Sequence, residues 1–343
     1  MATAEITIYG AGVLGLSCAL ACLKRGASVN VIDPNGAASG ASGGIVGALA
    51  PHTPDNWNPK KQFQFDSLIM TRDFWPWVEA ISGMTTGYSP TGRVQPIMTD
   101  RQIPQAHRRA ESSVKLWKGL ATWEVVEPSA SDWEPPTPTG LLIRDTLSGH
   151  LHPRKATLAM AEAVRILGGT FDRPKAGIII DATGWDGLKS LSAELDKAVG
   201  NGMKGQAALL RVDGAGDEQI FADTLHIVPH TDGTVCVGST SEREFDDPTA
   251  TDDQLDDIIS RARALVPMLQ NAPVIERWAG VRPRAKSRAP MMGRHPLNPD
   301  RFIVNGGFKI GFGMAPKMGE VMTDLVLDGM DRIPDEFQVA ASL

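Results

Sequence analysis

The sequence predicts an α/β protein in which a Rossmann-like nucleotide-binding domain is interleaved with a domain built on an antiparallel sheet. Two observations predict this fold. The chain opens with an apolar strand, a glycine-rich turn, a helix and a second apolar strand, which is the order of a βαβ unit. Residues 205–245 instead alternate as strands, with turns at Asp213-Gly214 and Asp232-Gly233, as antiparallel sheets do.

The elements can be placed in order along the chain. Residues 5–9 form a buried strand, Gly10 to Gly15 turn, a helix covers 13–25, and residues 28–32 form the second strand. Gly26 ends the helix, because glycine readily adopts the left-handed conformation found there. Beyond a loop over 34–51, periodicity and turn residues predict helices over 63–82, 101–119, 154–167, 251–266 and 316–329, strands near 92–98, 178–180 and 302–305, a strand with a basic loop over 274–295, and a proline-rich loop over 128–140.

The composition is that of an ordinary globular protein, with 42% hydrophobic and 22% charged residues in 343. The formal net charge of −6 argues against broad nucleic-acid binding, and no apolar run approaches the roughly 18–20 residues of a membrane span. The N-terminus lacks the basic region of a signal peptide, and Cys18, Cys22 and Cys236 do not make a disulfide framework. We expect a cytoplasmic protein without a metal site, and an oligomer is compatible with the sequence.

The motif Gly10-x-Gly12-x-x-Gly15 gives the first chemical signal. Its glycines allow a tight turn, close approach of the backbone to a pyrophosphate, and close packing of helix on strand. The helix N-terminus supplies N–H groups for phosphates, and Asp33 stands where a carboxylate accepts ribose hydroxyls, which favours FAD or NAD over NADP. A glycine turn without a ligand is the alternative. The residues expected along the dinucleotide here are Gly10, Ala11, Gly12, Val13, Leu14, Gly15, Asp33 and Pro34.

A second motif is the apolar strand Ile178-Ile179-Ile180 followed by Asp181-Ala182-Thr183-Gly184. It resembles the second signature of FAD proteins that carry two motifs. The end of such a strand meets the dinucleotide at the carboxyl edge of the sheet. We therefore expect Ala182, Thr183 and Gly184 beside the dinucleotide, although a buried strand that ends in a turn has the same pattern.

Further motifs, in their order along the chain, resemble those of one flavoprotein family. They are Ala50-Pro51, His152-Pro153-Arg154, the Ala-Thr-Gly strand end, Val237-Gly238-Ser239-Thr240, Trp278-Ala279-Gly280-Val281-Arg282-Pro283, and Gly306-Gly307-Phe308-Lys309-Ile310-Gly311 leading to Ala315-Pro316. This order resembles the D-amino-acid oxidase, glycine oxidase and sarcosine oxidase (DAO) family along nearly the whole chain. The resemblance implies a glutathione-reductase-2-like architecture with non-covalent FAD, in which 1–80, 141–195 and 281–343 bind FAD and 81–140 and 196–280 bind substrate.

The resemblance also implies roles for single residues. Arg282 corresponds to the arginine that grips the substrate carboxylate through two parallel bonds, and Lys309 matches a second cation found in sarcosine oxidases. The residues that would line the flavin are Ser39, Ser42, Gly43, Gly44, Gly47, Ala48, Leu49, Arg282, Gly307, Phe308, Lys309, Ile310 and Gly311. The alternatives are a surface arginine in a basic loop, a solvated lysine and a plain flexible loop.

Three departures from the family pattern bear on the site. His226 stands where glycine oxidases have a tyrosine, and it either replaces that contact with substrate or is only a strand residue. Arg282 stands where sarcosine oxidases link a cysteine to the flavin, so no covalent link is expected. The short stretch between Gly169 and Asp181 lacks the β-meander that contacts adenine in family members.

The resulting prediction is oxidation of the C–N bond of a small amino acid or N-substituted glycine. The α-C–H of the neutral amine delivers hydride to flavin N5, water hydrolyses the imine, and O2 or another acceptor reoxidises the flavin. Two rivals stay open. The loop over 38–43 also resembles FAD domains that oxidise a glycine-like group on a tRNA wobble uridine, with the basic stretch 277–294 on RNA phosphate. The other rival is a flavin-binding protein without turnover.

Overall fold

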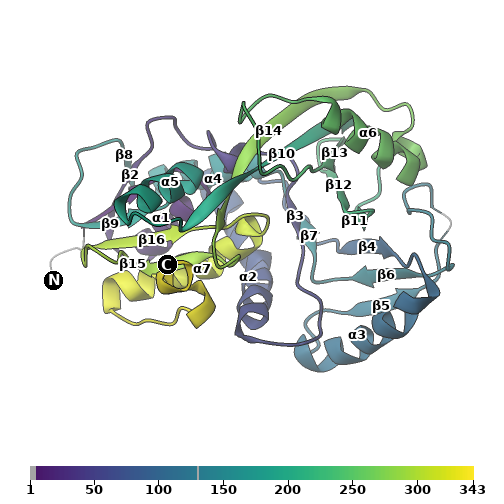
Figure 1. Cartoon of the computed structure of the whole chain (residues 1–343), viewed down its shortest axis with the longest axis horizontal. Coiled ribbons are helices and arrows are strands. Elements are labelled where there is room, and N and C mark those ends of the chain that lie inside the picture. The colour runs from purple at the N-terminus through teal and green to yellow at the C-terminus, as the bar shows by residue number, and fades with distance from the viewer. Residues whose placement is uncertain (1–4, 130) are drawn as a thin grey trace.

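Two large sheets, each covered by its own helices, dominate the fold (Figure 1). The computed structural model describes residues 5–129 and 131–343. Within them, a six-stranded sheet has the order β15-β16-β9-β1-β2-β8, and an eight-stranded sheet has the order β14-β10-β13-β12-β11-β4-β6-β5. The short strands β3 and β7 pair separately.

The bounds of the elements are as follows. The six-stranded sheet contains β1 (Glu5–Tyr9), β2 (Ser28–Ile32), β8 (Thr170–Phe171), β9 (Ile178–Asp181), β15 (Met291–Arg294) and β16 (Arg301–Asn305). The eight-stranded sheet contains β4 (Arg93–Pro96), β5 (Trp123–Val126), β6 (Leu142–Asp145), β10 (Gly200–Arg211), β11 (Gln219–Ala222), β12 (Leu225–His230), β13 (Thr234–Gly238) and β14 (Val274–Ala285). The separate pair is β3 (Ala48–Leu49) and β7 (Gly149–His150). The helices are α1 (Val13–Lys24), α2 (Pro59–Ser82), α3 (Ile103–Leu116), α4 (Pro153–Ile166), α5 (Gly184–Glu194), α6 (Asp253–Leu265) and α7 (Gly311–Asp328).

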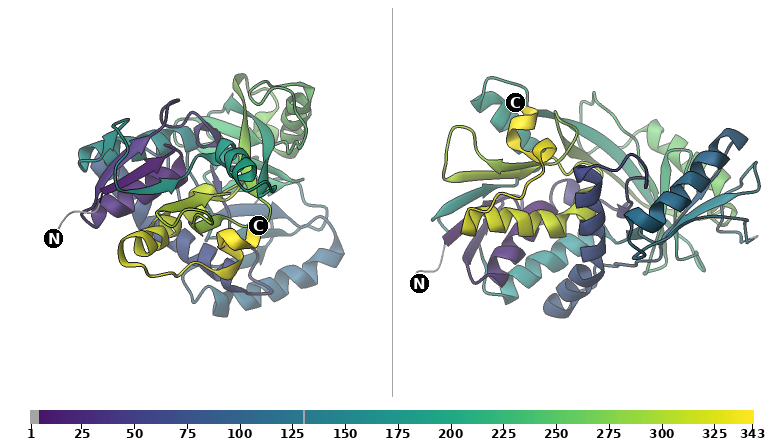
Figure 2. Two further views of the ribbon diagram at one scale, coloured as in Figure 1. Left: turned by 60° about the vertical axis from the view of Figure 1, so that its left-hand side comes forward. Right: turned by 90° about the horizontal axis from the view of Figure 1, so that it is seen from below.

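The six-stranded sheet is parallel at its centre, as the βαβ order predicts. β1 pairs in parallel with β2 on one side and β9 on the other, so that Ile8 lies between Val31 and Ile180, and all three are buried. Short runs of Val and Ile form such strands because both faces of a parallel sheet are covered. Helices α1, α4, α7 and α2 pack on one another as a layer beside this sheet (Figure 2).

The eight-stranded sheet is mainly antiparallel, and α6 packs against β10, β12 and β13. Leu255 and Ile258 of α6 join Ile227 and Val237 of the sheet in one apolar core. The α6 helix begins where the side chain of Asp252 accepts a hydrogen bond from the Gln254 N–H, because the first N–H groups of a helix lack partners. This region therefore has its own core.

A long antiparallel ribbon of β10 and β14 links the two sheets. At one end, Val199 and Ala285 pack with Leu188, Met291 and Ile303, which belong to the six-stranded sheet and its helix α5. The rest of the ribbon forms the edge of the eight-stranded sheet (Figure 1). Residues near the end of β14 therefore lie between the two halves of the molecule.

Several predicted bounds are corrected by the structure. The α2 helix begins at Pro59 rather than 63, because Asn58 caps it and proline suits the first helical position. The α7 helix begins at Gly311 rather than 316 and contains Pro316. The prediction began too late because the glycine-rich start of the helix resembles a loop. Neither α5 nor β5 was predicted.

The domain ranges inferred from the resemblance stay a prediction. β6 lies in the eight-stranded sheet although its residues fall within the range 141–195. Between Gly169 and Asp181 the chain forms only the two-residue strand β8, which pairs with β2, before it enters β9. No helix among the described residues has both the length and the apolar character needed to span a bilayer.

Candidate active site

The glycine turn between β1 and α1 is closed tightly by its neighbours. Gly10 adopts a φ of +103°, and a Cβ there would lie 2.4 Å from the Ala182 carbonyl oxygen. A Cβ on Gly15 would lie 2.1 Å from the carbonyl oxygen of Gly10. The N–H groups of Gly12 and Leu14 form no hydrogen bond within the described part of the chain. These N–H groups at the start of α1 are therefore available to phosphate oxygens.

Two side chains hold this turn in place. The Asp33 carboxylate accepts hydrogen bonds from Ala11 N at 2.8 Å and from Asn35 N at 3.1 Å. The Ser42 hydroxyl accepts from Val13 N at 3.0 Å, which sets the following loop against the first turn of α1. Each Asp33 oxygen keeps a lone pair, so the carboxylate can still accept a ribose hydroxyl.

Hydrogen bonds also fix the loop over 39–51. The His230 ring bonds the Ile45 carbonyl at 2.9 Å, and Arg154 Nε donates to the Gly43 carbonyl at 3.1 Å. Part of the loop forms β3, which pairs with β7. Of the predicted flavin-lining residues in this loop, Ser39 is exposed, whereas Gly43, Gly44, Gly47 and Leu49 are buried. Pro34, predicted to lie along the dinucleotide, is exposed.

Segments that are far apart in sequence meet at the carboxyl edge of the six-stranded sheet. Ala182 follows β9, and its N–H donates to the Tyr9 carbonyl at 2.7 Å, beside the glycine turn. A Cβ on Gly307, which follows β16, would lie 3.3 Å from Leu14. The structure thus brings together the ranges 10–15, 182–184 and 307–311, at the position where such sheets bind ligands.

The C-terminal segment leads into a second helix N-terminus at the same place. Phe308 N donates to the Pro283 carbonyl at 3.1 Å, which ties the segment to β14. A Cβ on Gly311, the first residue of α7, would lie 3.6 Å from Val13, the first residue of α1. Two helix N-termini, each with partial positive charge, are therefore adjacent.

The loop over 39–51 covers one face of the eight-stranded sheet. Trp278, Ala207, Gly238 and His226 lie opposite one another across β14, β10, β13 and β12, so their side chains share one face. A Cβ on Gly238 would lie 3.0 Å from Val46 of the loop. Small residues thus separate the Trp278 and His226 rings on the covered face.

His226 is a neutral ring on this face. Its centroid lies 4.8 Å from that of Phe221, and its Nδ1 is buried without a partner among the described residues. Burial, followed by the charges of Arg93 and Lys309, lowers the pKa of His226 to about 3. The uncharged imidazole can donate or accept a hydrogen bond. Its contact with substrate stays a prediction.

Arg282 is anchored from behind and carries an unused donor. Nη1 donates to the Ser239 hydroxyl at 2.9 Å, and Nη2 donates to the Thr240 carbonyl at 2.7 Å. Gly205 makes room for the guanidinium, because a Cβ there would lie 1.9 Å from Nη2. The Nε atom is buried and has no partner in the part of the chain that the structure describes. Burial lowers the pKa of Arg282 to about 10, against the opposing effect of Glu242, so it stays a cation at neutral pH.

A buried polar network supports the residues that hold Arg282, and sequence reasoning gave it no role. The Lys204 ammonium lies 3.7 Å from the Glu242 carboxylate, and both side chains are almost fully buried. Gln206 donates from its side chain to Glu242 at 3.1 Å and from its N–H to the Thr240 hydroxyl at 2.8 Å. The Thr240 hydroxyl also donates to Glu242. The network therefore fixes the backbone whose carbonyl accepts from Arg282.

Lys309 meets two arginines around the Phe308 ring. The ring centroid lies 5.8 Å from Lys309 Nζ, 5.9 Å from Arg282 Cζ and 5.4 Å from Arg284 Cζ. Partial burial, then Arg282 and Arg284, lowers the pKa of Lys309 although its side chain is exposed. The structure thus brings Arg282 and Lys309 together and adds Arg284, to which the sequence analysis assigned no role.

Comparison with protein families decides which family this site belongs to. The family model for FAD dependent oxidoreductases (DAO) matches residues 5–172 and 171–325. The chain belongs to the DAO family of FAD-dependent oxidoreductases. Its predicted fold class and family resemblance are confirmed.

Individual DAO-family relatives align along most of the chain. It is 25% identical over 367 residues to the bifunctional protein ThiO/ThiG of a Synechocystis strain, covering 95% of this chain and 52% of that protein. This chain thus spans about half the length of the bifunctional relatives. It is 24% identical over 355 residues to the glycine oxidase of Bacillus licheniformis, covering 94% of this chain and 93% of that one. The solved iminodiacetate oxidase of Chelativorans sp. BNC1 shares the fold, with a TM-score of 0.84, 20% identity, and coverage of 97% and 98%.

Proposed function

We propose that this chain binds FAD without a covalent link and oxidises the C–N bond of a small amine that carries a carboxylate. The observation that carries the proposal is the buried, unpaired Nε of Arg282, with Lys309 across the Phe308 ring. A buried cationic donor without an acceptor of its own indicates an anionic ligand. The names of the glycine oxidase and iminodiacetate oxidase relatives indicate substrates of this chemical kind.

The dinucleotide site fits FAD. The N–H groups of Gly12 and Leu14 form no hydrogen bond within the described residues, so they can bind a pyrophosphate. The starts of α1 and α7 adjoin, and their partial positive charge would stabilise the negative charge of a reduced flavin ring. Asp33 ends β2, where a carboxylate accepts ribose hydroxyls. A side chain on Gly10 would fill the close approach to Ala182.

The cysteines support non-covalent binding. Cys18, Cys22 and Cys236 are all buried. Burial raises the pKa of the Cys22 thiol to about 11 and also raises the pKa values of the Cys18 and Cys236 thiols. A sulfur link to a cofactor needs an accessible thiolate, and none of these thiols supplies one.

The side chains position the substrate and set its charge. Bound FAD supplies the oxidising power, by accepting a hydride from the α-carbon of the substrate. Arg282 holds the carboxylate and thereby fixes the α-carbon, while Gly205 and the Ser239 hydroxyl keep the guanidinium in place. The positive charges of Arg282 and Lys309 favour the neutral form of the substrate amine, because a nearby like charge lowers the pKa of an ammonium group. No side chain has to remove a proton from the α-carbon.

Absorbance of the purified full-length protein tests both halves of the proposal. We expect a flavin spectrum, release of the flavin on acid precipitation, and anaerobic bleaching by a member of a panel of glycine, sarcosine, proline and D-amino acids. Methylamine, which lacks a carboxylate, should bleach far more slowly. A colourless protein that FAD cannot reconstitute would contradict the FAD proposal, and a flavoprotein that no amine reduces would contradict the oxidation. The electron acceptor, oligomeric state and cytoplasmic location stay predictions.

A further inference from the structure

The active-site face of β14 carries a second arginine beyond Arg282. Side chains two residues apart share a strand face, so Trp278, Arg282 and Arg284 lie on the same face. Arg284 is opposite Asn201 and Arg282 is opposite Met203 in the register with β10. The two arginines are therefore one strand repeat apart, about 6.5 Å between their Cα atoms. A ligand held by Arg282 would have Arg284 within its reach.

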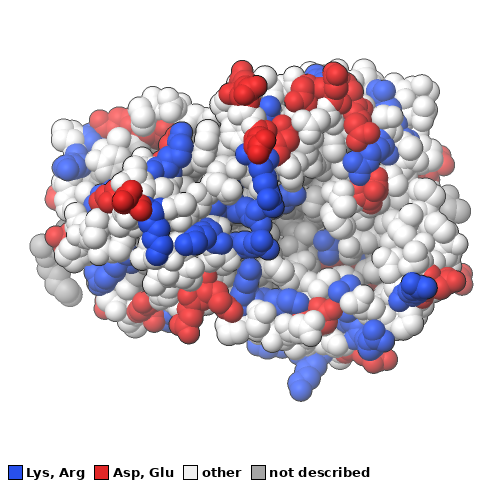
Figure 3. Space-filling model, in the orientation of Figure 1, with Lys and Arg blue, Asp and Glu red and all other residues white. Residues whose placement is uncertain are grey.

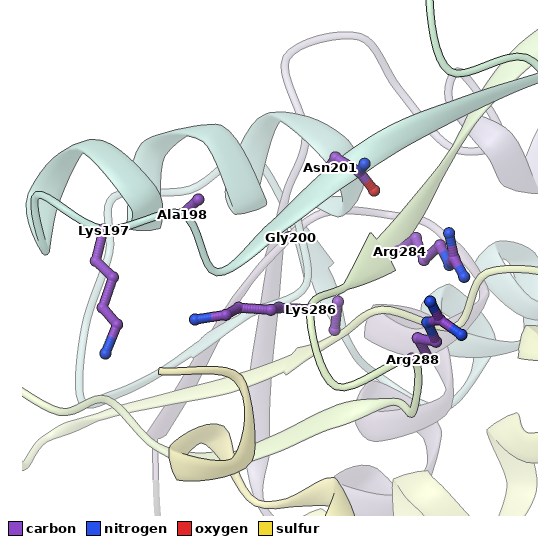
Figure 4. Close-up of a pocket in the computed structure, with 8 residues that line it drawn as sticks. Lys197, Ala198, Gly200, Asn201, Arg284, Lys286 and Arg288 are labelled. Atoms are coloured by element: carbon purple, nitrogen blue, oxygen red, sulfur yellow. The ribbon is translucent and has the colours of Figure 1, made fainter.

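Arg284 also lines a cavity of about 460 Å³ that carries only positive charge. Its lining residues are Lys197, Ala198, Gly200, Asn201, Arg284, Ala285, Lys286 and Arg288. Figure 4 shows the guanidinium groups of Arg284 and Arg288 on one side of the cavity, whereas Lys286 extends the other way, toward Lys197. In the space-filling view, basic side chains gather in the centre of this face of the molecule (Figure 3).

Arg284 and Arg288 lack the carboxylate partner that many other arginines of this chain have. Arg93, Arg144, Arg154 and Arg301 each lie within 4 Å of a carboxylate oxygen, as four examples. The side chain of Arg284 forms no ion pair or hydrogen bond with any described residue, and neither does that of Arg288. Like charges that line one cavity repel one another, and a bound anion would relieve the repulsion.

A single carboxylate does not account for this charge. Arg282 and Lys309 already supply two cations for one carboxylate. Arg284 and Arg288, on the same side of the cavity, are then left without an anion. We propose that the substrate is a dicarboxylic amine whose second carboxylate binds Arg284 and Arg288. This inference rests on the proposed function only in assigning the first carboxylate to Arg282.

Matched substrates test the inference in the holoenzyme. D-aspartate and D-asparagine have nearly the same shape but differ by one negative charge, and iminodiacetate carries a second carboxylate in place of one methyl hydrogen of sarcosine. Where the enzyme oxidises both members of a pair, we expect kcat/KM to be about 10- to 100-fold higher for the dicarboxylate. A hydrogen bond to a charged group contributes free energy that corresponds to a factor of about this size. Equal values within each pair would overturn the inference.

Variants assign the preference to these residues. Arg284→Gln and Arg288→Gln should lower kcat/KM for the dicarboxylate about tenfold or more beyond any loss that they cause for the monocarboxylate of the same pair. Arg101→Gln is the matched control, because Arg101 is exposed near the start of α3, far along the chain from this cavity. A loss that is equal for both members of a pair, or that Arg101→Gln reproduces, would contradict the inference.

A binding measurement separates this inference from the proposed activity. Malonate and acetate are not oxidised, and each should change the absorbance of the bound flavin. Malonate should bind at least tenfold more tightly than acetate, and Arg284→Gln should remove the difference. This result would support the second anion site even in a protein that no amine reduces, whereas equal affinities would overturn it in an active enzyme. Salt-dependent binding of tRNA that Arg284→Gln abolishes, without any malonate preference, would also overturn it.

Discussion

The two ends of β14 use arginine in opposite ways. Arg277, near the start of the strand, places its guanidinium 2.6 and 3.2 Å from the two carboxylate oxygens of Asp256 on α6. Arg282 instead donates to a hydroxyl and a backbone carbonyl, and Arg284 meets no carboxylate among the described residues. One strand therefore carries an arginine that pairs directly with a carboxylate and two arginines that form no ion pair with a described residue.

The difference comes from the elements that face each end. The first turn of α6 is acidic, which suits a helix N-terminus and also supplies the partner of Arg277. The other end of β14 faces Asn201 and Met203 of β10 and the Phe308 ring, none of which carries charge. An exposed pair such as Arg277 with Asp256 contributes only about 0–1 kcal/mol, whereas a buried cation without a counter-charge is costly unless a ligand supplies one.

The largest expected effect comes from removing each arginine in turn. Arg282→Leu should raise KM for a carboxylated amine about 100-fold or more, since charged hydrogen bonds of this kind contribute about 2–5 kcal/mol, while the flavin stays bound. Arg277→Leu should leave KM within about twofold and change stability by less than about 1 kcal/mol. Steady-state kinetics and flavin absorbance of the two variants check this.

An equal rise in KM for Arg282→Leu and Arg277→Leu would contradict this contrast, because the effect would then come from a disturbed β14 and not from a lost contact with the substrate. The contrast would also break if Arg282→Leu lost its flavin, since Arg282 would then support the cofactor. Unchanged kinetics in Arg282→Leu would remove this residue from the substrate site altogether.

A smaller effect is expected from Gly205→Ala. The added methyl group would lie 1.9 Å from Arg282 Nη2, so the guanidinium must shift away from its anchors on Ser239 and Thr240. We expect KM to rise about tenfold, as for the loss of one charged hydrogen bond, with flavin content unchanged. In the background of Arg282→Leu the same substitution should do nothing further to KM, and an additive loss would show that Gly205 acts elsewhere.

The fold was largely readable from the sequence because its signals are local. The Gly10 to Gly15 turn, the apolar strand before it and Asp33 after it lie within one short stretch, and β1, α1 and β2 form there. The start of α7 was misplaced because Gly311 and Gly313 resemble loop residues, although packing of Gly313 near Leu68 makes a small residue useful inside the helix. Tertiary packing had outweighed local propensity at that point.

The site was only partly readable, because its remaining members are cross-strand neighbours. Arg282 and Lys309 were found through motifs along the chain. Gly205 and Glu242 come near Arg282 only through the register of β10 with its neighbours, and no local sequence pattern reveals that register. The sequence shows Arg284 as one more positive charge, and what distinguishes it from Arg277 is that no carboxylate among the described residues pairs with it.

The smallest effect on KM at neutral pH is expected from Glu242→Gln, and it should appear as a pH dependence. Burial lowers the pKa of Arg282 to about 10, and the charge of Glu242 opposes this decrease. Removing the carboxylate should lower that pKa further. Because only the cation binds a carboxylate, affinity is lost as the pH rises through the pKa of Arg282. Lys309 deprotonates in both proteins, so acetate, which has no amine to titrate, should lose affinity at a lower pH in the variant than in the wild type, and the difference reports Arg282.

Two further measurements separate this tuning from a structural role. Glu242→Gln leaves the buried Lys204 without its carboxylate, so urea unfolding should show a loss of about 3 kcal/mol. Glu242→Asp keeps the charge and should restore the pH profile of acetate binding more fully than it restores stability. If the acetate profile of Glu242→Gln coincided with that of the wild type while stability fell, Glu242 would serve only to pair with Lys204. The charge of Arg282 would then be maintained without help from the network behind it, and Arg282 would differ from Arg277 in having no carboxylate that affects its charge.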